Sequence, residues 1–191
     1  MNVIEAVYEK NKGLADTLKE RSGLRRLLVE DLYPDSAHFI YELLQNAEDT
    51  GATEAAFILS KNGLTFEHDG REFDESDIRA ITDIGAGTKA DDDDQIGRFG
   101  IGFKAVFGYT ETPRIWSPTH SFEISEMVLP SVLEPCPDLE ERTRYELPFN
   151  SDKKSGEKAF SEVRDGLEEI SNKTLLFLSN MEMINLRIED T

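Results

Sequence analysis

The chain has 191 residues, 38% hydrophobic and 31% charged, which is enough for one sizeable core and predicts a single domain over residues 1–191. Lysine and arginine number 21 against 39 aspartates and glutamates, a net charge of −18. A surface this acidic repels nucleic-acid backbones and anionic lipids. We therefore expect no direct nucleic-acid or membrane binding. A nucleotide is not excluded, because local backbone amides can hold one small anion.

Cysteine usage and hydropathy favour a cytoplasmic protein. The single cysteine, Cys136, cannot form an intramolecular disulfide. The N-terminus has no charged-then-apolar leader, and the longest apolar runs fall short of the ~18 residues that a membrane span needs. We therefore expect a soluble, cytoplasmic chain.

The first part of the chain predicts helices on either side of a strand hairpin. Asn62-Gly63 tolerates the backbone angles of a tight turn, so the two apolar runs around it form an antiparallel pair. Asp74 is a good N-cap for the helix that follows. In order, the spacing predicts one or two helices over 3–22, a helix over 36–51 that Gly51 ends, strands over 52–60 and 64–69, and a helix over 75–84.

The second part begins with a polar loop and a glycine-rich stretch. Residues 85–95 carry glycines and four consecutive aspartates, which predicts a mobile surface loop. Residues 95–107, QIGRFGIGFKAVF, open onto a predicted helix. Beyond them we expect strands over 113–118, 120–125 and 142–149, a loop over 129–138, one or two helices over 159–180, and a strand beginning at 184.

This order of elements favours an α+β fold. We expect a two-layer α/β sandwich, with helices packed on one face of a mainly antiparallel mixed sheet. No internal repeat is visible along the chain. Because a strand is only beginning where the sequence stops, we expect the N-terminal fragment of a longer protein.

One predicted helix carries a polar stripe within an apolar surface. In YELLQNAED, Glu42, Asn46 and Asp49 recur at intervals of four and three residues and share one face. Polar groups bordered by core residues are costly to bury without partners, so they point to a ligand or a metal. An asparagine oxygen suits Mg²⁺, and a glutamate can orient or deprotonate a water. The alternative is a merely solvated polar face.

The glycine-rich stretch is an anion-site candidate of a less common kind. Gly97, Gly100 and Gly102 follow the spacing GxxGxG. This spacing matches neither the P-loop pattern GxxxxGK[ST] nor the dinucleotide fingerprint GxGxxG, which disfavours both sites. Glycines at a helix start still let backbone amides approach an anion. The alternative is a turn packed against a neighbouring helix.

Taken together, these segments resemble the GHKL ATPase superfamily. ELLQNAED is similar to its N-box, EHDG to its adenine-binding motif and GRFGIGF to its second glycine motif, in that order. ELLQNAEDTGA and GRFGIGFKAVF look most like the sacsin-like and large heat-shock-chaperone branches. The motifs cover about residues 36–110, and a strand match extends to about 149. The resemblance implies a Bergerat-type ATP-binding fold with ATP and Mg²⁺ as ligands.

The resemblance also assigns roles to single residues. Glu42 matches the catalytic glutamate that activates the hydrolytic water, and Asn46 matches the asparagine that holds Mg²⁺ against the phosphates. Asp49 matches a polar position near the nucleotide, and Thr143 a threonine near the adenine. The phosphate-binding loop is matched by Gly97, Arg98, Phe99, Gly100, Ile101 and Gly102.

The adenine motif departs from the family pattern. The usual form is Asp-x-Gly-x-Gly, whose aspartate accepts a hydrogen bond from the adenine amino group, whereas this chain reads His68-Asp69-Gly70-Arg71-Glu72. With Gly70 as the anchor, strict spacing puts His68 at the aspartate position. We favour Asp69 and Gly70 as the adenine-binding pair because a carboxylate is the stronger acceptor, and the register stays open.

The other charged groups are weaker candidates. Lys89 and Lys104 are candidates to contact a phosphate, although lysines at such positions are more often solvated. His38, His68 and His120 are too scattered for a zinc pattern.

The resemblance implies a domain that binds ATP·Mg²⁺, hydrolyses it slowly and closes residues 85–99 over the phosphates, driving conformational change in a larger sacsin-like or chaperone-like protein. The expected partners are ATP or ADP, downstream domains of the same polypeptide and a second copy in a homodimer. Efficient hydrolysis in the family usually needs a following domain, so weak or absent ATPase activity is expected here. The alternative is a nucleotide-gated interaction module that binds ATP or ADP without significant hydrolysis.

Overall fold

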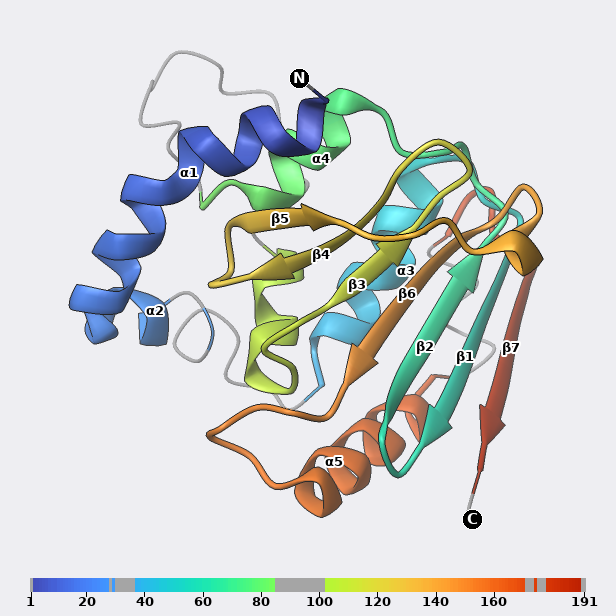
Figure 1. Cartoon of the computed structure of the whole chain (residues 1–191). Coiled ribbons are helices and arrows are strands. Elements are labelled where there is room, and N and C mark those ends of the chain that lie inside the picture. Colours follow the sequence, from blue (N-terminus) through green and yellow to red (C-terminus); the bar gives the residue numbers. More distant parts are fainter. Residues whose placement is uncertain are drawn as a thin grey trace.

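The fold is a seven-stranded mixed sheet with helices (Figure 1). The computed structural model describes residues 2–27, 29, 37–84, 102–170, 174 and 178–189. The strand order is β5-β4-β3-β6-β2-β1-β7, and neighbouring strands are antiparallel except for β1 and β7. The strands are β1 (Glu54–Ser60), β2 (Gly63–His68), β3 (Arg114–Trp116), β4 (Ser121–Ser125), β5 (Leu129–Val132), β6 (Thr143–Pro148) and β7 (Met183–Ile188). The helices are α1 (Val3–Glu20), α2 (Ser22–Arg26), α3 (Phe39–Asp49), α4 (Glu75–Thr82) and α5 (Gly156–Glu168), with 3₁₀ helices η2 (Gly102–Gly108) and η3 (Pro137–Leu139).

The core lies on one face of the sheet. Side chains alternate along the central strands, so Phe57, Phe66 and Tyr145 are buried while their sequence neighbours are half exposed. Helix α3, which lies behind the strands in Figure 1, adds Phe39 and Leu43 to the same core. The expected α+β fold, with helices packed on a mainly antiparallel mixed sheet, is confirmed.

The β1–β2 hairpin is confirmed, but its glycine has a different role from the one expected. Ser60 pairs with Gly63, so the turn residues are Lys61 and Asn62. A Cβ on Gly63 would stand 2.7 Å from the carbonyl oxygen of Leu147 on β6. Gly63 therefore allows two strands to approach closely, and the turn does not depend on it.

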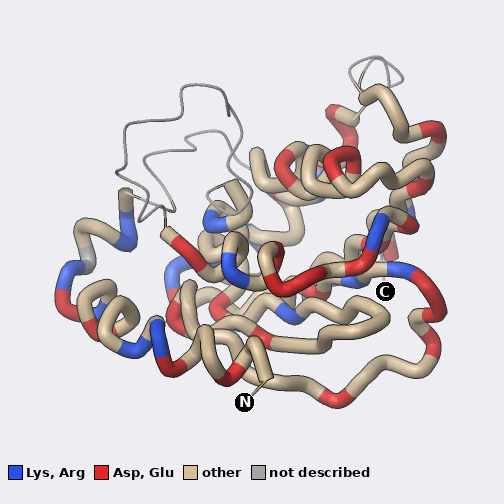
Figure 2. Tube along the Cα trace, turned by 90° about the horizontal axis from the view of Figure 1, so that it is seen from above, with Lys and Arg blue, Asp and Glu red and all other residues tan. Residues whose placement is uncertain are grey.

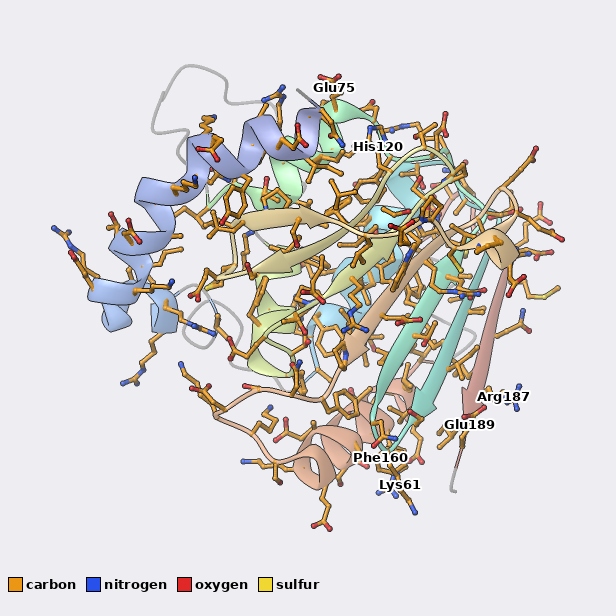
Figure 3. All side chains as sticks on the ribbon, viewed as in Figure 1. Lys61, Glu75, His120, Phe160, Arg187 and Glu189 are labelled. Atoms are coloured by element: carbon orange, nitrogen blue, oxygen red, sulfur yellow. The ribbon has the colours of Figure 1, made fainter. Side chains whose placement is uncertain are left out.

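The hairpin turn and the start of α4 lie at opposite ends of the molecule. Figure 3 shows Lys61 beside Phe160 of α5, and Glu75 and His120 at the far end. The hairpin turn lies beside the start of α5, because a Cβ on Gly156 would stand 3.9 Å from the Lys61 carbonyl oxygen, an ordinary van der Waals distance. The last residues of β2 therefore lie at the α4 end, away from the hairpin turn.

Two predicted helix ends agree with the structure. Helix α3 ends at Asp49, and Gly51 follows in the left-handed region with φ 74°. The predicted start of this helix, at residue 36, lies outside the described residues. Helix α4 has the predicted N-cap, because the Asp74 side chain accepts hydrogen bonds from the amides of Ser76 and Asp77.

The expectation of a loop over 129–138 is wrong at its start. Residues 129–132 form β5, which pairs with β4 at the edge of the sheet. Pro130 lies within this strand, and an edge strand tolerates a proline because one of its sides needs no amide donor. The predicted last strand is confirmed as β7, and α5 confirms a helix in the predicted 159–180 segment, beginning at Gly156 and ending at Glu168.

Figure 2 shows residues of both charges interspersed along the helices and outer loops. Ion pairs also link neighbouring strands, as Arg114 with Glu123 and Arg144 with Glu67, at 2.8 and 2.6 Å. No helix in the described part of the chain is long and apolar enough to cross a membrane.

Candidate functional site

The candidate site is built along one stripe of α3. Glu42, Asn46 and Thr50 follow one another at intervals of about one helical turn. At one end, a Cβ on Gly102 would stand 1.8 Å from Glu42 Oε2, so the carboxylate packs directly on the backbone of η2. At the other end, a Cβ on Gly70 would stand 2.0 Å from Thr50 Oγ1. Gly102 thus packs on α3 one turn before Asn46, and Gly70 packs on Thr50, the C-cap residue, one turn after it.

Three polar side chains of this region each have one buried atom without a hydrogen-bond partner. Asn46 Nδ2, His68 Nε2 and Thr143 Oγ1 are three of the five such atoms in the described part of the chain. His68 and Thr143 face each other across β2 and β6. A buried unsatisfied polar atom costs about 1–3 kcal/mol, and native proteins contain few of them. Their concentration here indicates a position for a polar ligand.

His68 and Asp69 are placed on different sides of the chain. His68 is buried and its Nδ1 accepts a hydrogen bond from the Gly70 amide at 3.2 Å. Burial lowers the pKa of the His68 imidazole to about 4. The exposed Asp69 carboxylate accepts hydrogen bonds from the Thr53 amide and hydroxyl and from the Glu54 amide, at 2.8, 2.7 and 2.8 Å. Of the two, His68 lies among the unsatisfied groups.

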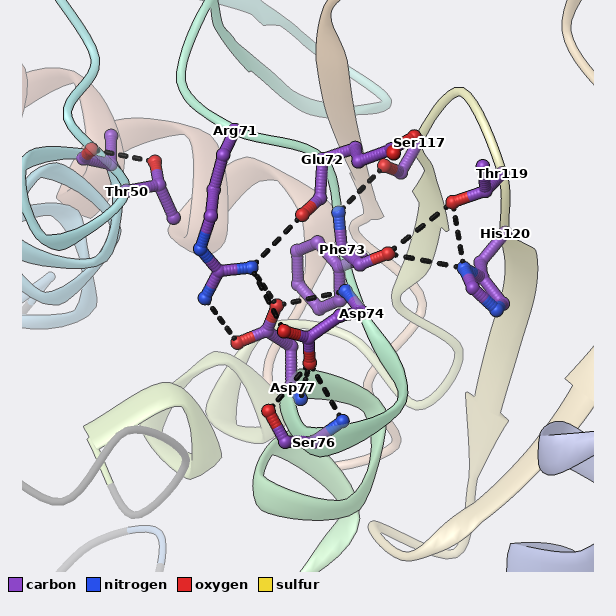
Figure 4. Close-up of polar contacts among 11 residues, drawn as sticks. Thr50, Arg71, Glu72, Phe73, Asp74, Ser76, Asp77, Ser117, Thr119 and His120 are labelled. Atoms are coloured by element: carbon purple, nitrogen blue, oxygen red, sulfur yellow. Dashed lines mark hydrogen bonds and ion pairs between the residues drawn. The ribbon is translucent and has the colours of Figure 1, made fainter.

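The segment after Gly70 is braced by Arg71 (Figure 4). Its guanidinium donates to both carboxylate oxygens of Asp77, at 2.6 and 3.0 Å, and to the Glu72 carbonyl at 3.0 Å. Asp77 also accepts a hydrogen bond from the Asp74 amide at 2.9 Å, in the first turn of α4. The loop that follows Gly70 is therefore fixed by a bidentate side-chain contact.

An aromatic wall borders His68. The rings of Phe66, His68, Phe73 and Phe103 lie with their centroids 5.7, 6.1, 6.1 and 6.1 Å from that of Tyr145. They come from β2, the segment before α4, η2 and β6, whereas α3, which carries Asn46, contributes none of these rings. Aromatic side chains beside a few polar groups are typical of small-molecule sites.

The two carboxylates at the end of α3 differ in position. Asp49 is exposed and accepts a hydrogen bond from Gln45 Nε2 at 2.9 Å. Glu48, which the sequence analysis passed over, is buried and accepts hydrogen bonds from the amides of residues 179–181 at 2.6, 2.7 and 3.0 Å. Glu48 thus fastens the segment before β7 to α3. Its only sequence signal is a carboxylate beside the apolar face of the helix.

The expectation that Lys104 is solvated is wrong. Lys104 is fully buried, and its Nζ donates to the carbonyl oxygens of Ile81, at the end of α4, and Met127, at 2.6 and 2.7 Å. Burial lowers the pKa of Lys104 to about 7, although Asp83 opposes the shift. Backbone carbonyls, which no sequence pattern displays, supply the acceptors.

Most of the predicted phosphate contacts lie outside the described residues. These are Lys89, Gly97, Arg98, Phe99, Gly100 and Ile101, whose roles stay predictions. Among the described residues, no group of three or more His, Cys, Asp or Glu side chains gathers into a metal site.

Comparison with known proteins gives one family. Residues 21–128 match the Sacsin domain, a range that contains α3, β2 and η2 but not Thr143. Over 119 residues the chain is 39% identical to Protein NO VEIN of Arabidopsis thaliana, covering 56% of this chain and 4% of that protein. Over 102 residues it is 34% identical to Sacsin of Homo sapiens, covering 44% of this chain and 2% of that protein. The chain spans a small fraction of the length of these relatives.

Proposed function

Because the chain belongs to the Sacsin domain family, we propose that it is a GHKL-type, Mg²⁺-dependent ATP-binding and slowly hydrolysing domain that drives conformational change in a longer sacsin-like or chaperone-like protein. One observation carries the proposal: the unpartnered buried atoms of Asn46, His68 and Thr143. The resemblance places all three positions in a nucleotide site, His68 by strict motif spacing. All three lack a hydrogen-bond partner within the described part of the chain, and a hydrogen-bonding ligand would offset the cost of their burial.

The rings beside His68 support a flat base as part of the ligand. The ring centroids of Phe66 and Tyr145 lie 5.8 and 6.1 Å from that of the imidazole. When bound, Mg²⁺ would neutralise phosphate charge. Asn46 would hold it, because half a turn of the amide presents the oxygen in place of the nitrogen.

Glu42 is the residue proposed to handle the water. Its side chain is 29% exposed, packs on Gly102, and has its Oε1 3.4 Å from His38 Nε2. A carboxylate held there accepts a hydrogen bond from a water and takes up its proton as that water attacks a phosphorus atom. The contact with Gly102 fixes the position of the Glu42 carboxylate. The position of a general base decides how much that base accelerates the reaction.

A binding module without hydrolysis is the second candidate. It uses the same unsatisfied atoms and Mg²⁺ position, and differs only in making no use of the Glu42 carboxylate. The two candidates therefore predict the same nucleotide affinity and different rates of phosphate release.

Calorimetric titration with a non-hydrolysable ATP analogue and Mg²⁺ tests binding. Asn46→Ala is expected to weaken binding that depends on Mg²⁺, whereas Gln45→Ala, on the exposed side of the same turn, leaves it unchanged. Glu42→Ala is expected to keep binding and abolish phosphate release. Absence of binding at millimolar nucleotide would refute the proposal; equal phosphate release by wild type and Glu42→Ala would favour the binding module.

A further inference from the structure

Tyr109 connects the end of η2 to the start of α3 and to α5. It directly follows η2, and its side chain is buried. Its hydroxyl oxygen accepts a hydrogen bond from the Ala37 amide at 2.8 Å, and the hydroxyl donates to Glu162 Oε2, on α5, at 3.0 Å. Burial raises the pKa of the Tyr109 phenol, so the proton donated to Glu162 stays on the hydroxyl.

Ala37 precedes α3 in a backbone conformation that needs support. Its φ of 61° lies in the left-handed region, which a residue with a side chain keeps only where its surroundings hold it. The bond from its amide to Tyr109 is one such contact. Helix α5 supplies the other, because a Cβ on Gly166 would stand 2.8 Å from the Ala37 Cβ. Ala37 is therefore held between Tyr109 and α5.

The first turn of α3, which carries Glu42, depends on this start. The amide of Glu42 donates to the His38 carbonyl, the next one after that of Ala37, at 3.4 Å. A bond of this length is weak, so the turn gains from support outside the helix. Phe39, in the same turn, packs on Tyr109 with the ring centroids 4.9 Å apart. Tyr109 thus contacts the start of α3 through both its hydroxyl and its ring.

We propose that Tyr109 is a positioning residue for Glu42, which it serves by holding the start of α3 through its hydroxyl. This inference rests on the proposed hydrolytic function, because it concerns how well the Glu42 carboxylate is placed as a general base. At the start of η2, Gly102 packs on that carboxylate. Just after the end of η2, Tyr109 holds Ala37. Through Glu162, a displacement of α5 would reach the base without any contact with the nucleotide.

The test begins with Tyr109→Phe, which keeps the ring and removes the hydroxyl. With ATP and Mg²⁺ we expect phosphate release to fall by about tenfold, because the lost hydrogen bond loosens the turn without removing the base. The Kd of a non-hydrolysable ATP analogue should stay within about twofold. The Ala37 amide, now without its acceptor, should exchange with solvent about tenfold faster or more. Glu162→Ala should also lower phosphate release, whereas Glu162→Gln should retain most of it, because its amide oxygen still accepts from the hydroxyl.

Thr110→Val is the matched control, because it removes a buried hydroxyl at the next position that hydrogen-bonds to Asn150 and Thr112. It should lower the free energy of unfolding about as much as Tyr109→Phe and leave phosphate release unchanged. If Glu42→Ala abolishes phosphate release and Tyr109→Phe leaves it unchanged, the inference is overturned and the proposed function stands. Equal losses of release in Tyr109→Phe and Thr110→Val have the same meaning. If Glu42→Ala releases phosphate as fast as the wild type, the hydrolytic function and the inference both fail.

Discussion

The contact between Gly102 and Glu42 gives the sharpest prediction for catalysis. In Gly102→Ala the new Cβ would stand 1.8 Å from Glu42 Oε2, and an ordinary contact begins at 3.4 Å, so the carboxylate must move by about 1.6 Å. A displacement of ~1 Å in a reacting group typically costs about 100-fold in rate. We therefore expect phosphate release to fall by about 100-fold, with nucleotide affinity little changed.

Stability should change far less than activity in this variant. The atoms that must move belong to a flexible side chain, so the expected loss is within about 1 kcal/mol in urea unfolding. Gly13→Ala, in α1, is the control. Its new Cβ would meet nothing within 4 Å, and alanine is about 1 kcal/mol more favourable than glycine inside a helix, so this variant should not be destabilised. In the double variant Glu42→Asp/Gly102→Ala, the shorter aspartate side chain leaves room for the new Cβ. The rate of phosphate release should therefore be higher than in Gly102→Ala alone. Unchanged phosphate release in Gly102→Ala would refute the role given to Glu42.

Three further predictions concern stability. Folding lowers the pKa of His68 from 6.5 to about 4, so between these pH values the unfolded chain binds a proton that the folded chain does not, and the free energy of unfolding should fall by about 3 kcal/mol from pH 6.5 to pH 4. In urea titrations His68→Asn should remove most of this pH dependence. An unchanged pH dependence in the variant would show that His68 is not its source. Gly63→Ala forces a Cβ to 2.7 Å from the Leu147 carbonyl and should cost about 1–3 kcal/mol by thermal unfolding, which a wild-type melting temperature would contradict. Glu48→Ala leaves three backbone amides without their acceptor and should raise amide exchange across residues 179–181, whereas the exposed Glu9→Ala should not.

The sequence predicts best where one pattern determines one structure. The α3 stripe is an example: helical spacing brings Glu42 and Asn46 onto one face, and burial of Asn46 follows from the apolar residues beside it. The Asp74 cap and Gly51 are equally local, because capping chemistry involves only the next few residues.

Prediction is weaker where the outcome depends on the partner across the fold. The exposed position of Asp69 and the buried position of His68 depend on hydrogen bonds that Asp69 accepts from Thr53, just before β1, and from Glu54, its first residue. Lys104 is buried because carbonyls from two distant segments meet at its amine. In the sequence Pro130 indicates a loop, whereas in the structure it lies in β5, an edge strand, where a proline is tolerated. In each case the deciding contact is long-range and leaves no periodic trace.

The hydrogen bond from Lys104 to Ile81 links two parts of the chain that flank the glycine-rich motif. Lys104 lies in η2 and Ile81 near the end of α4, and one buried hydrogen bond of 2.6 Å joins them. Pulling α4 away from η2 must first break that bond in a low-dielectric interior, where it is strong. The two elements are therefore joined in the fold. Gly102, in the same 3₁₀ helix as Lys104, is also the residue on which the Glu42 carboxylate packs, so a force that separates α4 from η2 would reach that side chain.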